Sequence, residues 1–264
     1  MESVTATQFQ SDAALAHLKA AEERHFWFAS RNRYIVDFFR SQAVTRDASV
    51  VEVGCGRGSV LRYLHHQGLR IDGIELNPSL AQAAQNSVPG CRILAGDVCD
   101  ESMPDVLGRY DVVCLFDVLE HAREPDYLLH GCKRMLKPGG LLIGTVPALR
   151  TLWSRLDEVS EHRIRHDLDS LRDELESAGF EPVSLRYFFQ ALVPVIWWQR
   201  RSLRRASDQR ECPQACDEVV AKGLELPNPM TNTIARIVCG FERHVRRFIP
   251  LDSIPGASLL FAAR

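Results

Sequence analysis

The stretch VVEVGCGRGSVLRYL, residues 50–64, determines the architecture of this 264-residue chain. Apolar and β-branched residues lead into three glycines, Gly54, Gly56 and Gly58, and an amphipathic run begins directly after them. This order predicts a buried strand, a glycine turn and the start of a helix. Glycines suit a backbone that takes positive φ or lets a ligand approach, and the first helical turn offers free N–H groups. The stretch therefore predicts a loop that binds a nucleotide-type cofactor.

The spacing of the glycines disfavours a nicotinamide dinucleotide. The dinucleotide fingerprint G-x-G-x-x-G would place its third glycine at position 59, where this chain has Ser59. Glu52 also lies two residues before Gly54, where a pyrophosphate would be close. A carboxylate there favours a ligand that carries a cationic or ammonium group.

The pattern E-x-G-C-G-x-G at residues 52–58 resembles motif I of the class I S-adenosylmethionine-dependent methyltransferases. D-V-L-E-H at residues 117–121 and L-K-P-G-G at residues 136–140 resemble later motifs of that family, so the resemblance covers about residues 50–147. It implies a Rossmann-like, doubly wound α/β sheet of seven strands with an antiparallel last strand. It also implies S-adenosylmethionine as cofactor, S-adenosylhomocysteine as product, and no metal. The loop residues expected to contact the cofactor are Glu52, Gly54, Cys55, Gly56 and Gly58.

Two further strands are predicted to end in acids beside the cofactor. The segment RIDGIEL, residues 70–76, ends near Glu75, whose carboxylate can accept hydrogen bonds from both ribose hydroxyls. The segment CRILAGD, residues 91–97, ends at Asp97, and a simple turn aspartate is the alternative there. A helix is expected to begin at Pro78 with Asn77 as its cap. By resemblance, the residues around the adenine are Leu76, Asn77, Asp97 and Val98.

A fourth buried strand is predicted over YDVVCLF, residues 110–116. Ligands lie at the carboxyl ends of strands in open α/β sheets, so Phe116, Asp117 and Val118 are expected to contact the cofactor. His121 follows, either beside the transferred methyl group or as a structural residue at a helix start. A helix over residues 126–136, a stop at residues 137–140 and a fifth strand over residues 141–146 complete this part.

The N-terminal 48 residues are predicted to be helical. Apolar side chains recur at helical spacing through residues 25–39. An amphipathic helix at the domain edge is one interpretation, and a lid over the cofactor is the other. The pattern E-x-x-H-F-W-F-x-x-R resembles the N-terminal signature of one subgroup of the family. By that resemblance Arg31 meets the methionine carboxylate and Trp27 is a second contact.

The segment after the fifth strand, residues 148–166, collects polar side chains that include Trp153, His162, Arg163 and His166. In the resembled fold it lies over the mouth of the active site, so these residues are substrate candidates. A histidine there can act as a general base because its pKa lies near the working pH. A solvated connecting loop is the alternative. The candidate catalytic residues are His162 and His121.

The rest of the core is predicted as a helix over residues 167–179, a strand over residues 180–189 and the last strand over residues 257–262. The predicted organisation is a helical lid (1–48), a methyltransferase core (49–189), a helical insertion (190–256) and the last core strand (257–264).

The insertion carries an apolar run, FFQALVPVIWW at residues 188–198, followed by arginines. An apolar face with tryptophans and a basic flank is typical of an interfacial helix, which favours peripheral membrane contact through residues 188–210. A cap over a hydrophobic substrate pocket and a homodimer interface are the alternatives. The arginines are Arg200, Arg201, Arg204, Arg205 and Arg210.

Composition excludes other classes of protein. A net charge of −2 and a pI near 6.5 give no reason to expect a nucleic-acid partner. The N-terminus lacks a secretory pattern and no apolar run is long enough to span a bilayer. Eight cysteines without a signal peptide indicate reduced thiols, and Cys212 and Cys216 are expected to be loop thiols rather than zinc ligands. A cytoplasmic location is predicted, with contact at the inner membrane face as a further alternative.

Together these features predict a methyltransferase that acts on an oxygen or nitrogen of a small-molecule or lipid-linked acceptor. A non-catalytic scaffold that binds S-adenosylmethionine is the alternative, because it would keep the same loop without turnover.

Overall fold

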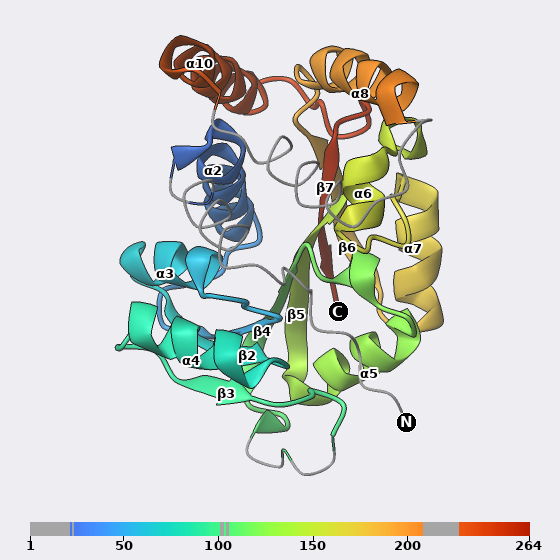
Figure 1. Cartoon of the computed structure of the whole chain (residues 1–264). Coiled ribbons are helices and arrows are strands. Elements are labelled where there is room, and N and C mark those ends of the chain that lie inside the picture. Colours follow the sequence, from blue (N-terminus) through green and yellow to red (C-terminus); the bar gives the residue numbers. More distant parts are fainter. Residues whose placement is uncertain (1–21, 23, 101–102, 104–105, 208–226) are drawn as a thin grey trace.

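A computed structural model describes residues 22, 24–100, 103, 106–207 and 227–264, with the side chains of residues 201–207 excluded. Seven strands form one sheet in the order β3-β2-β1-β4-β5-β7-β6 (Figure 1). Strands β1 to β5 are parallel to one another, whereas β7 runs antiparallel between β5 and β6. The predicted doubly wound sheet with an antiparallel last strand is therefore confirmed. The strands are β1 (Ser49–Val53), β2 (Arg70–Glu75), β3 (Ile93–Ala95), β4 (Tyr110–Phe116), β5 (Leu136–Pro147), β6 (Pro182–Phe188) and β7 (Ser258–Ala263).

Helices cover both faces of the sheet. In Figure 1, α2, α3 and α4 lie on one side and α5, α6 and α7 on the other. Each side receives alternate side chains of the same strand, since Val50 joins one apolar cluster while Val51 and Val53 join the other. The helices are α2 (Phe26–Ser41), α3 (Ser59–His66), α4 (Pro78–Ser87), α5 (Pro125–Met135), α6 (Arg155–Val159), α7 (Leu168–Ser177), α8 (Val193–Ser207) and α10 (Pro229–Val245).

Two predicted strand boundaries differ from the structure. The third strand spans only β3. The Gly96 N–H makes the last bond of its pairing with β2, to the Glu75 carbonyl at 3.0 Å, and the chain leaves the strand at Gly96, whose φ is +157°. The predicted stop at residues 137–140 lies inside β5. Pairing begins at Tyr110 with Leu136 and resumes at Val112 with Leu141, so these residues form an irregularity in the strand rather than a turn before it.

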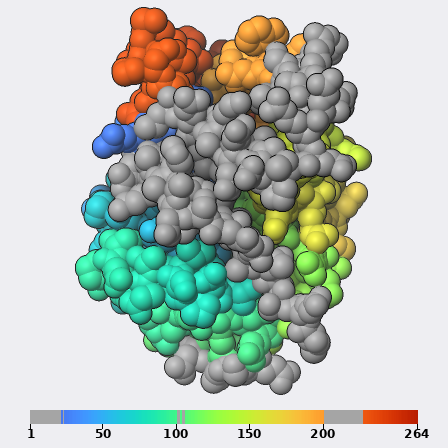
Figure 2. Space-filling view, in the orientation of Figure 1, coloured from blue at the N-terminus to red at the C-terminus, as the bar shows by residue number. Residues whose placement is uncertain are grey.

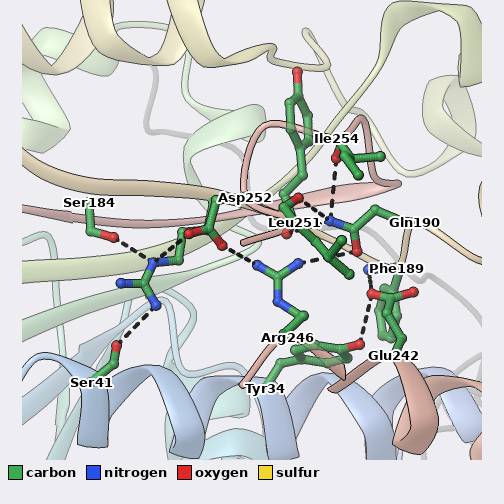
Figure 3. A network of polar contacts seen from close by, with 12 residues as sticks. Tyr34, Ser41, Ser184, Phe189, Gln190, Glu242, Arg246, Leu251, Asp252 and Ile254 are labelled. Atoms are coloured by element: carbon green, nitrogen blue, oxygen red, sulfur yellow. Dashed lines mark hydrogen bonds and ion pairs between the residues drawn. The ribbon is translucent and has the colours of Figure 1, made fainter. Parts of the chain in front are cut away.

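A buried acid on helix α10 of the insertion forms hydrogen bonds that hold α10 against α2. Glu242 of α10 is almost fully buried, and its carboxyl group accepts hydrogen bonds from the Tyr34 hydroxyl at 2.8 Å and the Phe189 N–H at 2.9 Å (Figure 3). It also accepts the Ala191 N–H at 2.9 Å. One turn further, Arg246 donates to Asp252 at 2.7 Å (Figure 3). The N-terminal helix, the end of β6 and the insertion are thus held by one polar network.

Residues 190–256 contain helices α8 and α10 in their described part, and the division of the chain into these units stays a prediction. The predicted membrane segment, residues 188–210, does not begin at the surface. Phe188 and Phe189 are fully buried, with the Phe189 ring 4.3 Å from the ring of Trp27. These first residues of the segment 188–210 therefore belong to the core and cannot contact a membrane. Residues 208–226, with Arg210, Cys212 and Cys216, lie outside the described residues, as do the side chains of Arg201, Arg204 and Arg205. Within the described part of the chain, no helix is long and apolar enough to cross a bilayer.

Candidate functional site

The glycine loop after β1 has the conformation that its sequence predicts. Gly54, Gly56 and Gly58 have φ values of +70°, +55° and +77°. The N–H of Gly54 donates to the Ile74 carbonyl at 2.8 Å, and a Cβ on Gly54 would lie 2.8 Å from Val118. A Cβ on Gly56, in contrast, would meet none of the described residues within 4 Å. The loop is thus packed against β2 and the end of β4 at Gly54 and open above Gly56.

Glu75 lies at the carboxyl end of β2, directly beside this loop. Its carboxylate accepts the N–H of Gly56 at 2.8 Å and that of Asn77 at 2.9 Å. Asn77 caps α4 through its side chain and Pro78 is the first residue of the helix, as predicted. Each carboxylate oxygen keeps lone pairs after these contacts, so Glu75 can accept further hydrogen bonds.

Asp97 follows β3 at the next strand end. Its Oδ1 accepts the Cys99 N–H at 2.9 Å, which fixes the carboxylate in a tight turn. Val98 is buried beside it. Asp97 can hold this turn and still bind a ligand, because its Oδ2 takes no part in the hydrogen bond from Cys99.

Arg31 of α2 reaches the end of β4 and forms an ion pair with Asp117. The other oxygen of Asp117 accepts the Thr145 hydroxyl at 2.8 Å, and the residue itself has a φ of +56°. Arg31 is buried, and its Nε has no hydrogen-bond partner among the described residues. A guanidinium with an unused donor at this position can accept a carboxylate from a ligand.

Two more carboxyl groups lie near Arg31. Glu52 is 3% exposed, and burial raises its pKa to about 8 against the opposing charge of Arg31. Its Oε2 finds no hydrogen-bond partner in the described part of the chain. Glu22 hydrogen-bonds Ser59 at the start of α3, and burial raises its pKa too. Buried carboxyl oxygens that lack donors fit a ligand that brings N–H groups.

Beyond Asp117, two histidines from different segments lie together. The rings of His121 and His162 are 4.8 Å apart in an edge-to-face arrangement. The pKa of His121 is lowered to about 4, chiefly by burial and secondly by the charge of the nearby His162. Glu120 is 1% exposed, neither of its carboxyl oxygens has a hydrogen-bond partner among the described residues, and burial raises its pKa well above the ordinary value.

His162 is oriented by Asp157 at 3.0 Å from its Nδ1. Asp157 is buried yet receives Arg165 at 2.6 Å, Arg200 at 2.8 Å and the Ser154 N–H at 2.8 Å. Burial opposes ionisation of Asp157, but the bond from His162 and the two arginines outweigh it and lower its pKa. Asp157 is therefore charged, and it holds the proton of His162 on Nδ1.

The other predicted site residues lie apart from these groups or at their edge. His166 is fully buried with its Nε2 2.5 Å from Glu174 of α7, so we assign it no place in the site. Trp27 packs on Phe189. The Arg163 side chain is exposed, although its N–H donates to the Glu120 carbonyl at 2.8 Å, and Trp153 is half-buried.

Sequence reasoning missed three groups in the site: Glu22, Glu120 and Asp157. Glu120 and Asp157 lie in the motifs already quoted, but a buried acid has no signal of its own in a sequence. Glu22 is the first residue of the N-terminal signature, and its spacing from Arg31 was the available clue.

The sequence of this chain is similar to those of known proteins. Residues 20–185, more than half of the chain, match a family model described as "Methyltransferase domain". A ubiquinone biosynthesis O-methyltransferase of Pseudomonas syringae pv. tomato is 30% identical over 148 residues, which cover 53% of this chain and 62% of that protein. The chain spans about half of the length of the curated relatives that it matches, from 46% to 62% in these cases.

Solved structures share the fold. A chain of the complex between the Haloferax volcanii Trm112 methyltransferase activator and its methyltransferase is similar with a TM-score of 0.58 at 21% identity, covering 98% of this chain and 96% of that chain. The phosphoethanolamine N-methyltransferase 2 of Haemonchus contortus in complex with S-adenosyl-L-methionine is similar with a TM-score of 0.56 at 16% identity, covering 88% of this chain and 52% of that chain.

Proposed function

This chain belongs to the class I S-adenosylmethionine-dependent methyltransferases, and we propose that it methylates an oxygen or nitrogen of a small-molecule or lipid-linked acceptor. One observation carries the proposal. Acids at the carboxyl ends of β1 and β2 and a buried arginine surround a glycine loop that is open above Gly56. Ligands of open α/β sheets bind at this edge.

The residues present fit the cofactor. Glu52, with its unpartnered Oε2, suits the ammonium group, and Arg31, with its unused Nε, suits the carboxylate. Glu75 would accept the ribose hydroxyls, and Asp97 and Val98 would face the adenine. We propose Leu76, Asn77, Phe116 and Val118 as the apolar and backbone contacts around these groups.

When bound, S-adenosylmethionine supplies a methyl group on a positively charged sulfur. The acceptor loses a proton and gains the methyl group, while the sulfur keeps the electron pair of the broken bond. The chain's part is to position the acceptor and exclude water, which accounts for most of the acceleration in such displacements. We propose that His121 and His162, next to Asp117, interact with the acceptor's nucleophile.

Titration calorimetry with S-adenosylhomocysteine, with NAD as the control ligand, tests the cofactor assignment. Micromolar binding of S-adenosylhomocysteine and no binding of NAD are expected. Binding of NAD instead, or of neither ligand, would overturn the assignment.

Turnover separates an enzyme from a non-catalytic scaffold. Incubation with radiolabelled S-adenosylmethionine and lipid and metabolite extracts is expected to label an acceptor. The variant His162→Gln should lose this labelling and still bind S-adenosylhomocysteine. Labelling that is equal in both proteins would remove His162 from the reaction.

We further propose that the outer face of α10 meets a lipid surface, which supports a lipid-linked acceptor. Large apolar side chains at helical spacing are half to three-quarters exposed on it, and α10 and α8 protrude at the same end of the molecule (Figure 2). Arg247 is exposed at its end, beside Phe248. The exposed side chains are Met230, Ile234, Ile237 and Phe241 on α10, and Phe248 just after its end.

Sedimentation with vesicles of phosphatidylglycerol and phosphatidylcholine tests this surface. The variant Ile237→Glu should lose vesicle binding, whereas Val183→Glu on the exposed side of β6 should keep it. If the wild-type protein stays in solution and sediments as a dimer, the face is an interface between copies instead.

A further inference from the structure

We propose that Glu120, His121 and His162 form a binding site for a divalent transition-metal ion. One ligand atom from each residue, a carboxyl oxygen and two imidazole nitrogens, lies within 4.8 Å of the other two. A metal ion bound by such atoms holds them about 3 Å apart or slightly more. The proposal requires side-chain rotations that bring the three ligand atoms from the present spacing to that one. The family resemblance of the motifs implies no metal, so this site goes beyond what the sequence predicts.

The carboxyl group of Glu120 is the first reason. It is 1% exposed, and both of its oxygens lack a hydrogen-bond partner in the described part of the chain. Leaving a buried acid in that state is unfavourable, whether or not it is ionised. A cation between Glu120 and the histidines removes this cost.

The orientation of the two rings is the second reason. His162 donates from Nδ1 to the charged Asp157, and His121 hydrogen-bonds the backbone carbonyl of Glu161. Each ring therefore has one nitrogen held by an acceptor and the other available to a metal. Histidines that bind metals nearly always have such an outer acceptor, which fixes the tautomer and the direction of the free lone pair.

The backbone holds the two segments in register, which is the third reason. The Arg163 N–H donates to the Glu120 carbonyl at 2.8 Å, and the His162 N–H donates to the Asp157 carbonyl at 2.8 Å. Glu161, which precedes His162 in the chain, takes a φ of +57°, a left-handed conformation that is costly for a residue with a Cβ. This turn brings His162 over His121.

The ligand set indicates the class of metal. Two imidazoles and one carboxylate suit Zn²⁺, Mn²⁺, Fe²⁺ or Co²⁺, whereas Mg²⁺ and Ca²⁺ prefer oxygen ligands throughout. Three protein ligands leave positions open, as in catalytic rather than structural sites. We expect an acceptor oxygen to take an open position, and this role rests on the proposed function; the binding of the metal does not.

Calorimetry with Zn²⁺ on the full, chelator-treated chain tests the site. One ion per chain is expected to bind, and Glu120→Gln, His121→Gln and His162→Gln should each weaken it by about tenfold or more. The control His130→Gln, an exposed histidine of α5, should bind as the wild type does. Equal affinities in all five proteins would overturn the proposal.

Two further measurements test whether the metal binds at these three residues. Co²⁺ gives charge-transfer bands when cysteine thiolates bind it, so a spectrum with those bands alone would place the metal on the chain's cysteines and refute the site. For variants that fail to fold, Mn²⁺ added to the wild-type protein should broaden the ring-proton resonances of His121 and His162 before those of His130. Broadening in the reverse order would also refute it.

The two proposals fail separately. If S-adenosylhomocysteine binds and Zn²⁺ does not, the metal site is wrong and the methyltransferase function stands. If Zn²⁺ binds with the expected variant pattern and S-adenosylhomocysteine does not, the reverse holds.

Discussion

Arg31 of helix α2 and Asp117 at the end of strand β4 form an ion pair across 86 positions of the sequence. Asp117 is also bound to Thr145 of β5, so the pair ties the N-terminal helix to two neighbouring strand ends. Arg31 is 7% exposed, which makes this an ion pair largely removed from solvent. The N-terminal helix is therefore part of the site, and its charge is positioned before any ligand arrives.

The variant Arg31→Ala should weaken S-adenosylhomocysteine binding by about 10- to 100-fold, because it removes a charge-assisted partner of the ligand carboxylate and leaves Asp117 unpaired. Calorimetry measures this. Arg33→Ala, on the exposed side of the same helix, is the matched control and should bind normally. Equal loss in both variants would show that the helix, and not the Arg31 side chain, matters.

Replacing Asp97 by alanine should weaken cofactor binding by about tenfold while the protein stays folded, since among the described residues its side chain accepts one backbone hydrogen bond, from the Cys99 N–H. Calorimetry and thermal melting together check both parts. The exposed Asp100→Ala serves as the control. Unchanged affinity of Asp97→Ala would remove the adenine assignment.

The stability of the cofactor-free protein should fall as the pH rises from about 5 to about 8, because of Glu52. Burial raises its pKa to about 8 from an ordinary 4.5, so in this window the folded chain holds a proton that the unfolded chain has lost. The full penalty, on the order of a few kcal/mol, is present above pH 8. Glu52→Gln has no proton to lose and should make this dependence shallower, while Glu120 and Glu22, whose pKa values burial also raises, keep the remaining part.

Urea unfolding at about pH 5 and about pH 9 measures the effect of Glu52. Glu158→Gln, at an exposed pair with Arg155, should keep the wild-type slope. A Glu52→Gln protein whose stability changes with pH as the wild type's does would contradict the assignment.

Glu242→Gln should destabilise the protein by about 1–3 kcal/mol, because a neutral amide cannot accept all three hydrogen bonds that the buried carboxylate accepts. Tyr34→Phe, which removes one of these bonds, should cost about 1 kcal/mol. Denaturant midpoints at a fixed slope test both. The double variant should cost less than the two single changes added together, since the residues share one interaction.

The strand ends that carry the cofactor residues could be predicted because the information is local. The run of apolar residues before Gly54, the acid that closes β2 and the cap at Asn77 each depend on neighbours in the sequence, and the structure has all three. The boundaries of β5 could not be predicted in this way. Glycines usually end a strand, but here pairing with Tyr110 holds Leu136 in the sheet before them.

The buried acids were missed for a different reason. Glu120, Asp157 and Glu242 resemble ordinary surface acids in a sequence, because the segments that bury them, and the main partners of Glu242 and Asp157, lie elsewhere in the chain. Tyr34 is 208 positions from Glu242, and Arg200 is 43 positions from Asp157. Only the folded topology brings such pairs together.

The network at Glu242 has a kinetic consequence. The Glu242 side chain, which belongs to α10, hydrogen-bonds both α2 and the residues that follow β6. Helices α2 and α10 must therefore move together or not at all. Arg31 travels with α2, so release of a ligand held by Arg31 requires displacement of the exposed face of α10 as well. A partner docked on α10 is therefore expected to slow the exchange of that ligand. If docking also changes the affinity for the ligand, the bound ligand changes the affinity for the docked partner by the same factor.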